Sequence, residues 1–322
     1  ISRSAKSLLG IINDVLDISK MESGKIDVAN EIFLFETFIE HIVELFSVAT
    51  KEKKIKFIYN PESALPYSLI SDPTRLQQVL SNLLSNAIKF TPQNGEIIFS
   101  IKVIDIFEDN VKIYFLIKDN GIGMTSEQQK VIFNPFSQAD DGISRKYGGT
   151  GLGLSICSDI IKLMNSEIEL KSIPNEGSEF SFVLDFKVDK FKNEQKTLDT
   201  NLKILLHCSD GNNDKLRQNI QNHISKIGVI SDYSDANKKG DILFCCGMNN
   251  LDNVIEEFKK QNNKSLIIYV GDSSNITNNK IKEEINHYLE LPIYGSKIYN
   301  ILVEHTDIHK KKKKKSKDVQ KF

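Results

Sequence analysis

The sequence predicts an α/β protein of two domains, because two separate runs of alternating helices and strands flank a polar segment. Residues 31–187 interleave helices with strands as a two-layer α/β sandwich requires. From residue 202 a second alternation of short apolar strands with helices predicts a small parallel sheet. The length of 322 residues suits about two domains of roughly 100–200 residues each. We therefore divide the chain into segments 1–26, 27–188, 189–201, 202–308 and 309–322.

The first segment has the apolar spacing of a bundle or coiled-coil helix. Apolar side chains recur at alternating spacings of four and three residues from Ile1 to Val15, and Gly24 is placed to end the helix. Because a helix this short cannot bury its apolar stripe alone, we expect it to pack against another helix. That helix would come either in cis from upstream residues or in trans from a homodimer. Because the chain begins at Ile1 rather than methionine, we expect residues upstream.

Hydrophobic patterns place the elements of the first domain. The expected strands are Glu31–Phe35, Ile55–Tyr59, Glu96–Ile104, Val111–Asp119, Glu167–Ser172 and Glu179–Phe186. The expected helices are Glu36–Thr50, Asp72–Phe90, Glu127–Phe133 and Gly151–Met164. A hairpin through Phe107–Asn110 means that the sheet is not purely parallel.

Residues 189–201 are polar and lack a sustained period, so they predict a linker. After it, strands are expected at Leu202–His207, Asp241–Cys246 and Ser265–Val270, and helices at Asn213–Ile227, Leu251–Gln261 and Gly295–His305. The last segment carries six consecutive lysines at 310–315 and predicts a disordered, solvated tail. Attraction to anionic lipid or nucleic acid is the physical alternative for the tail.

Several classes of protein are excluded by composition. No apolar run approaches the roughly 20 residues of a membrane helix, and the first residues show no secretory signal pattern, which predicts a soluble, intracellular chain. The four cysteines, Cys157, Cys208, Cys245 and Cys246, form no Cys-x-x-Cys and have no histidine cluster beside them. They suggest neither a zinc site nor a disulfide framework, so we expect reduced, mostly buried thiols.

The helix at Asp72–Phe90 sets polar side chains on one face. Asp72 is a suitable N-cap and Pro73 fits the first helical position. Asn82, Asn86 and Lys89 are spaced i, i+4 and i+7, while leucines and a valine supply the buried stripe. Taken alone, this pattern also suits an ordinary exposed face.

Two glycine loops follow that helix in a fixed order. Asp119 ends an apolar strand before Gly121 and Gly123, where a carboxylate can accept a hydrogen bond from an exocyclic amine and a flat ring can approach the backbone. The segment Gly148–Leu154 leads into an apolar helix, whose free N-terminal amides suit phosphate. An ordinary turn and a hinge are the plain alternatives, and neither loop has the P-loop or Rossmann pattern.

Together, the asparagine helix, Asp-x-Gly-x-Gly, Phe133-Asn134-Pro135-Phe136 and Gly-x-Gly-x-Gly resemble the N, G1, F and G2 boxes of sensor histidine kinases. Residues 1–26 resemble the second helix of that family's dimerisation domain. The resemblance spans residues 1–187 and implies a two-layer Bergerat (GHKL) ATPase sandwich preceded by a bundle helix. Chaperones, topoisomerases and mismatch-repair ATPases share that fold but lack this helix.

The resemblance also implies roles for particular residues, with ATP and Mg²⁺ as cofactors. Asp119 would bind the adenine amine beside Gly121 and Gly123, Asn86 would coordinate Mg²⁺, and Asn82 and Lys89 would serve the metal and phosphate region. Residues 134–147 would form a mobile lid anchored by Phe133 and Phe136, with Arg145 or Lys146 reaching the γ-phosphate. The expected catalytic residues are Asn86, Lys89 and Arg145. The triphosphate would be lined by Gly149, Thr150, Gly151, Leu152, Gly153 and Leu154.

The chain departs from the family at the phosphoacceptor. None of its six histidines is followed by an acidic residue, so the accepting histidine is expected upstream or on a partner in trans, with a downstream receiver or phosphotransfer protein as a further partner. Nucleic acid is not expected as a partner. The alternative is an ATP-responsive pseudokinase, a regulatory binding module without productive phosphotransfer.

Residues 202–308 resemble the receiver domains of hybrid histidine kinases, which have a flavodoxin-like fold. Cys208-Ser209 stands where a receiver has an acidic pair, and Cys246 stands at the position of the phosphorylated aspartate. The resemblance would allow Cys208 and Cys246 to lie near each other, and we expect buried, inert thiols there. Without these carboxylates no Mg²⁺ site and no acyl phosphate are expected, so the segment resembles a degenerate receiver used for docking or regulation. An unrelated α/β domain is the alternative.

Overall fold

A computed structural model describes residues 12, 28–62, 65–66, 68–137, 151–189, 202–208, 214–224, 229–232, 239–247, 250–262 and 265–302. The chain divides into two compact units, one with Ile1–Phe57 and Glu62–Glu194, and the other with Gln195–Phe322 and the short segment Ile58–Pro61. The predictions for the N-terminal helix, the lysine tail and all but the first residue of the linker lie outside the described residues.

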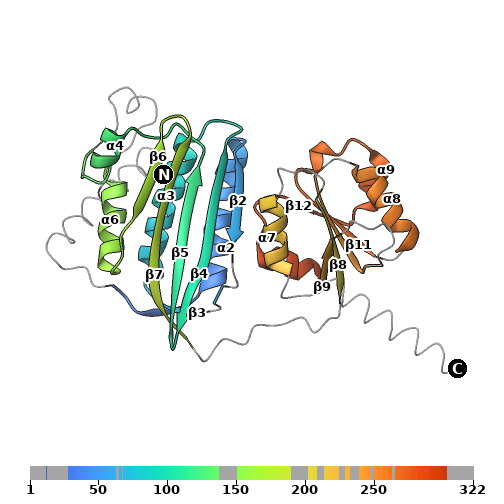
Figure 1. Cartoon of the computed structure of the whole chain (residues 1–322), viewed down its shortest axis with the longest axis horizontal. Coiled ribbons are helices and arrows are strands. Elements are labelled where there is room, and N and C mark those ends of the chain that lie inside the picture. Colours follow the sequence, from blue (N-terminus) through green and yellow to red (C-terminus); the bar gives the residue numbers. More distant parts are fainter. Residues whose placement is uncertain are drawn as a thin grey trace. The chain divides into compact units, whose positions relative to one another are not determined.

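The first unit is built on a seven-stranded sheet (Figure 1). The strands run in the order β1-β3-β7-β5-β4-β2, and β6 pairs with β7. The register pairs of β1 with β3, β3 with β7, β7 with β5 and β6, and β5 with β4 are all antiparallel. The strands are β1 (Glu31–Leu34), β2 (Lys56–Pro61), β3 (Ser68–Ser71), β4 (Glu96–Phe107), β5 (Asn110–Asp119), β6 (Glu169–Ile173) and β7 (Gly177–Val188).

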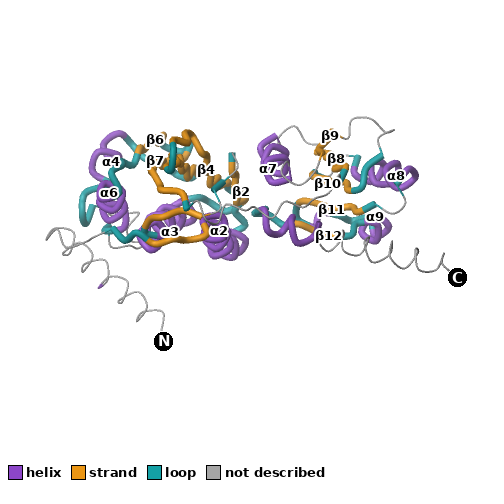
Figure 2. Tube along the Cα trace, turned by 90° about the horizontal axis from the view of Figure 1, so that it is seen from below, coloured by secondary structure: helices purple, strands orange, loops and turns teal. Residues whose placement is uncertain are grey.

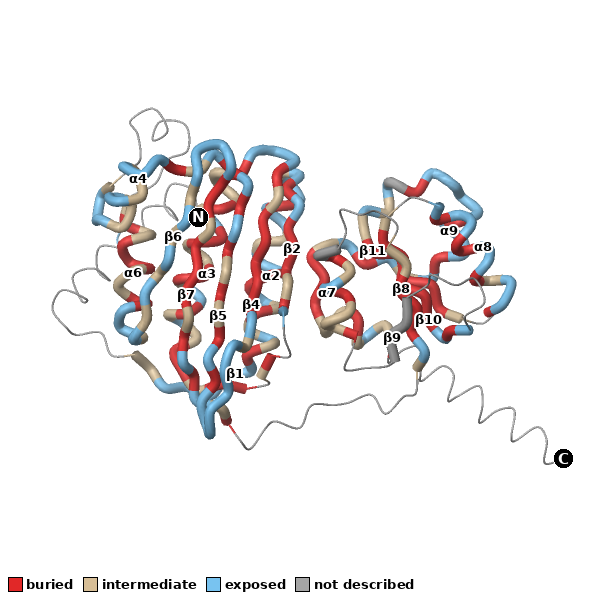
Figure 3. The backbone as a smooth tube through the Cα atoms, in the orientation of Figure 1, coloured by how far each residue is buried: buried red, intermediate tan, exposed pale blue. Residues whose placement is uncertain are grey.

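Helices α2 (Phe35–Glu52), α3 (Pro73–Phe90) and α6 (Gly153–Leu163) lie together on one face of this sheet (Figure 2). Figure 3 colours the chain by burial, and buried residues run along the strands of this sheet. Burial alternates along β5, where Val111, Ile113, Phe115 and Ile117 are buried and the residues between them are partly buried or exposed. The ring of Phe115 stacks on Phe182 of β7 at 4.9 Å between centroids, and meets Phe35 of α2 edge-on. This is the two-layer α/β sandwich that the sequence predicted.

Several expected boundaries were wrong by a few residues. Helix α4 spans only Ser126–Val131, because Phe133 lies in the turn that follows it. Strand β4 continues to Phe107, so the β4–β5 hairpin turns on Glu108 and Asp109 alone. Strand β3 was not predicted, since its four residues are too short for a periodic pattern.

The second unit holds a five-stranded sheet in the order β12-β11-β10-β8-β9, and every register pair in it is parallel. Numbered within the unit, the order is 2-1-3-4-5, that of flavodoxin-like doubly wound sheets. The sequence predicted the parallel sheet but missed the short strands β9 and β12 and the helix α9. The strands are β8 (Lys203–Cys208), β9 (Val229–Asp232), β10 (Ile242–Cys246), β11 (Leu266–Val270) and β12 (His287–Leu289).

Helices cover both faces of this sheet. Helix α7 (Asp214–Ile224) and residues 295–302 pack on one face, against a cluster that includes Ile204, Phe244 and Cys246. On the other face α8 (Leu251–Gln261) and α9 (Asn279–Glu284) pack against a cluster that includes Leu243 and Cys245, and the 3-10 turn η3 (Ser273–Asn275) lies between them in the chain. Neighbouring residues of one strand thus serve opposite cores.

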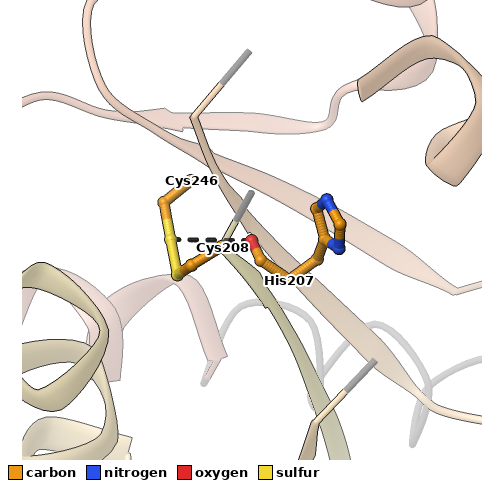
Figure 4. Close-up of a disulfide and its surroundings, with 3 residues drawn as sticks. All are labelled: His207, Cys208 and Cys246. Carbon is orange, nitrogen blue, oxygen red and sulfur yellow. Dashed lines mark hydrogen bonds between the residues drawn. A yellow bond between two sulfur atoms is a disulfide. The ribbon is translucent and has the colours of Figure 1, made fainter. Parts of the chain in front are cut away.

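The expectation that all cysteines are reduced was wrong for two of them. Cys208 and Cys246 are joined as a disulfide between β8 and β10 (Figure 4). The sequence contained no spacing that pairs them, because the parallel register of two strands brings together residues 38 positions apart. Cys157 and Cys245 are free and buried, as expected.

Candidate nucleotide-binding site

Helix α3 is the rigid base of the candidate site. The Asp72 side chain caps it by accepting the backbone N–H of Arg75 at 2.9 Å, as predicted. The predicted stripe of Leu76, Val79, Leu80, Leu83 and Leu84 is at most 1% exposed. On another face of the helix, Asn82, Asn86 and Lys89 are only partly buried, which is the exposure that contact with a ligand requires.

The first glycine loop begins at the buried end of β5. Asp119 is 6% exposed, and its Oδ1 accepts the backbone N–H of Gly121 at 2.8 Å. Burial raises the pKa of the Asp119 carboxyl above its ordinary value, and backbone hydrogen bonds from Gly121 and Ser178 partly oppose that shift. A Cβ on Gly121 would lie 2.6 Å from the carbonyl oxygen of Phe90, so the loop lies directly against the end of α3.

The turn between β6 and β7 closes around Asp119. A Cβ on Gly177, whose φ is +111°, would overlap the carbonyl oxygen of Asp119. Gly123 has a φ of +63°, and a Cβ there would overlap the carbonyl oxygen of Ile173. Beside this contact the hydroxyl oxygens of Ser172 and Ser178 lie 3.0 Å apart.

Gly177 and Ser178 were not singled out from the sequence. The segment Pro174-Asn175-Glu176-Gly177 contains turn-forming residues, but nothing local in it indicates contact with Asp119.

The second glycine loop meets α3 near its middle. Asn82 Nδ2 donates to the carbonyl oxygen of Gly153 at 3.4 Å, and a Cβ on Gly153 would contact the Asn82 carboxamide at 3.6 Å. Gly151, with a φ of +72°, lies against the backbone of Phe136 and Ser137.

Helix α6 starts at Gly153, two residues later than expected, after the buried residue Leu152; the predicted site residue Leu154 is partly buried in its first turn. No side chain of the described residues caps this N-terminus. Its first amides are therefore suited to an anion.

The structure thus brings both glycine loops to one helix. Gly153 touches α3 at Asn82, Gly121 touches it at Phe90, and Asn86 and Lys89 lie between those points along the helix. Burial lowers the pKa of Lys89, whose Nζ lies 4.7 Å from the centre of the Phe90 ring.

The predicted lid is described only at its start. Phe133 is partly buried, whereas Phe136 is 71% exposed and has a φ of +61°. Arg145, Lys146, Gly149 and Thr150 lie outside the described residues.

The donor chemistry fits a magnesium ion that is shared with a nucleotide. Within the described ranges no three His, Cys, Asp or Glu side chains group together as a metal site. The carboxamide oxygens of Asn82 and Asn86 are hard donors, one helical turn apart. Mg²⁺ commonly takes one or two protein oxygens and completes its shell with phosphates and water. Two carboxamide oxygens are therefore a sufficient set of protein ligands.

A two-layer sandwich in which two glycine loops meet an asparagine-bearing helix defines a Bergerat-type ATPase domain. Residues 71–188 match the family described as "Histidine kinase-, DNA gyrase B-, and HSP90-like ATPase".

The relatives of the chain are sensor histidine kinases. It is 42% identical over 180 residues to "Sensor histidine kinase GacS" of Pseudomonas protegens, a match that covers 56% of this chain and 20% of GacS. It is 39% identical over 188 residues to "Hybrid signal transduction histidine kinase L" of Dictyostelium discoideum, covering 58% of this chain and 11% of the relative. The chain therefore spans a fifth or less of the length of these curated relatives.

A solved structure shares the fold. The "Crystal structure of ShkA full-length in complex with AMPPNP" matches with a TM-score of 0.67 and 21% identity, over 94% of this chain and 63% of that one. In the part of the chain that the structure describes, no helix is long and apolar enough to cross a membrane.

Proposed function

We propose that this chain is the catalytic core of a two-component sensor histidine kinase, which binds Mg-ATP and transfers the γ-phosphoryl group to a histidine. The observation that carries the proposal is the convergence of both glycine loops on the polar face of α3. The matches to sensor kinases and to a fold solved in complex with AMPPNP support it.

In this proposal the adenine ring enters beside the first loop. The Asp119 carboxylate, which accepts a hydrogen bond from the Gly121 amide, also accepts one from the exocyclic amine of adenine. The glycines leave room for the flat ring. The buried position makes this hydrogen bond stronger than it would be in water.

The phosphates extend from there toward α6. The N-terminal amides of α6 bind phosphate oxygens, and Lys89 contributes positive charge from α3. Asn86, with Asn82 beside it, holds the Mg²⁺ ion, which when bound neutralises phosphate charge and aligns the γ-phosphoryl group. Arg145 or Lys146 reaches that group from the lid.

The acceptor histidine belongs to an upstream segment or to a partner. Residues 1–26 form the second helix of a dimerisation domain in this proposal, and the active form is a homodimer in the cytoplasm. His41 is the one histidine in the sequence of the first unit, and it lies exposed on α2.

The second unit acts as a degenerate receiver that docks or regulates. Its 2-1-3-4-5 strand order supports this, as does the position of Cys246 at the end of the third strand, where a receiver would carry its aspartate. Treatment with a small phosphodonor should leave residues 202–308 unmodified, and an aspartyl phosphate there would contradict the assignment.

Radiolabelled γ-phosphate transfer tests the kinase. The chain is incubated with labelled ATP and Mg²⁺ together with a histidine-bearing dimerisation domain, supplied in cis by an extended chain. We expect acid-labile label that is lost in Asn86→Ala and Gly151→Ala and kept in the control Gln77→Ala, which changes an exposed residue of the same helix.

Binding of a fluorescent ATP analogue separates the two functions weighed above. Nucleotide binding without label on any acceptor would replace the kinase with an ATP-responsive regulatory module. Failure to bind nucleotide would contradict both.

A further inference from the structure

The Cys208–Cys246 disulfide lies at a particular place in the second unit. Cys208 is the last residue of β8 and Cys246 the last residue of β10, and the two are register partners in adjacent parallel strands. Their Cα atoms are 4.6 Å apart, within the range of about 4.4–6.8 Å that disulfides span. The disulfide therefore joins two strands at their carboxyl ends, on the face of the sheet that α7 covers (Figure 4).

That edge is the topological switch point of the sheet. The chain leaves β8 toward β9 at one side and leaves β10 toward β11 at the other, so the strand order reverses between β8 and β10. Doubly wound sheets bind their ligands in the crevice outside the carboxyl ends of the two strands at this point. Here the two cysteines occupy that position.

The two cysteines differ in their burial. Cys246 is fully buried in the cluster formed with α7, whereas Cys208 is only partly buried at the margin of the same cluster. Cys246 Sγ also lies 3.5 Å from the carbonyl oxygen of His207, the residue before Cys208. Cys208 is therefore the member of the pair that is in contact with solvent.

The neighbouring thiol offers a contrast. Cys245 faces the opposite core, is fully buried, and has a thiol pKa raised by that burial. A thiol is nucleophilic only as the thiolate, so Cys245 is inert although it adjoins Cys246 in the chain.

We propose that Cys208 and Cys246 form a reversible thiol–disulfide exchange site, which reacts with small-molecule disulfides through Cys208. The Cys208 thiolate attacks one sulfur of the small disulfide, forming a mixed disulfide and releasing one thiolate. Cys246, after losing its proton, then attacks Cys208 Sγ and breaks the mixed bond, releasing the second thiolate. Two protein thiols are oxidised to one disulfide, and the small disulfide is reduced to two thiols.

The site shares no residue with the candidate nucleotide site and acts on the second unit. Oxidation ties the ends of the first and third strands together at the switch point, and reduction frees them.

Thiol counting on the full chain tests the proposal. The chain is reduced with dithiothreitol, freed of it, exposed to oxidised glutathione, and then denatured and alkylated. All four cysteines should be alkylated in the reduced chain and only two in the oxidised chain, with one peptide pair linked through Cys208 and Cys246. Four alkylated cysteines after oxidation, or a linkage through Cys157 or Cys245, would overturn the proposal.

Two single variants test the order of attack. Cys246→Ser should accumulate a glutathione adduct on Cys208, whereas Cys208→Ser should acquire almost none, because its remaining cysteines are buried. An adduct on Cys246 that forms as fast as that on Cys208 would show that the route is wrong. Should a variant not fold, rapid acid quenching of the unaltered chain gives the same information, since the mixed disulfide must then be found on Cys208.

Discussion

Asp119 shows how one side chain joins stability to ligand binding. Its carboxylate is buried at the end of β5, held by the amides of Gly121 and Ser178, and carries a raised pKa because burial disfavours its charge. The folded chain therefore binds this proton more tightly than the unfolded chain. The stability that this proton contributes is present below the ordinary carboxyl pKa and is lost as the pH rises through the folded pKa.

Nucleotide binding should have the opposite pH dependence. The proposed hydrogen bond needs an ionised acceptor, so affinity for ATP should fall as the pH drops through the raised pKa of Asp119. Asp119→Asn should weaken binding by roughly 10- to 100-fold, since a hydrogen bond to a charged group contributes about 1.5–3 kcal/mol. It should also flatten the pH dependence.

Calorimetric titration at several acidic and neutral pH values measures both effects. Glu96→Gln, which alters a partly exposed carboxylate at the start of β4, is the control and should keep the pH dependence of the unaltered chain. Unchanged affinity in Asp119→Asn would contradict the assigned role.

Gly177 must lack a side chain because its backbone packs against the carbonyl oxygen of Asp119. In Gly177→Ala the added Cβ would overlap the Asp119 carbonyl oxygen, and the backbone would keep a φ of +111° that alanine rarely adopts. The substitution should therefore lower the free energy of unfolding by at least about 1 kcal/mol. Urea denaturation checks this. Glu176→Ala, one position earlier and exposed, should change the midpoint little. Equal midpoints for the two variants would show that the turn relaxes away from Asp119.

At the scale of elements, α4 is short but firmly attached. Thr125 and Gln128 form a capping box at its start. Gln129 Nε2 donates to the carbonyl oxygens of Met124 at 3.1 Å and Ser172 at 2.9 Å. One side chain thus ties this helix to the first glycine loop and to β6.

Gln129→Ala should therefore loosen the loop and weaken ATP affinity several-fold, because two backbone carbonyls lose a donor worth about 1 kcal/mol each. Affinity is measured with a fluorescent ATP analogue. The matched control is Lys130→Gln, at an exposed position of the same helix. If the two variants bind alike, α4 does not position the loop.

Long, strongly periodic elements were predictable, whereas the strands that were missed are all short. Helix α3 has an N-cap, a proline at its first position and a full apolar stripe within its own 18 residues. Strands β3, β9 and β12 have only four, four and three residues, too few for an alternating pattern to be distinguished from a loop. They are strands because the longer strands β7, β8 and β11 pair with them.

At the scale of the whole molecule, each unit has its own core and its own site. The nucleotide site depends on the helical face of the first unit's sheet, and the cysteine pair lies at the carboxyl edge of the second unit's sheet. A change made at one site should be detected first in the unit that contains it.

Reduction of the disulfide should destabilise the second unit. A bond that closes a loop of 38 residues constrains the unfolded chain by about 3–4 kcal/mol in the chain-entropy description. Hydrogen exchange with and without reductant should show faster exchange of the β8 and β10 amides in the reduced chain. The double variant Cys208→Ser with Cys246→Ser should not respond to reductant, and a response in it would place the effect elsewhere.

The sequence alone determined whatever depends on local pattern: the α/β class, the course of α3 and the order of the asparagine and glycine motifs. Periodicity, caps and loop chemistry are properties of neighbouring residues, so they can be recognised without a structure. Only the tertiary structure decided that Gly177 closes on Asp119 and that Cys208 bonds to Cys246. Both contacts join residues 38 or more positions apart, and strand pairing across the sheet, which no local pattern specifies, brings them together.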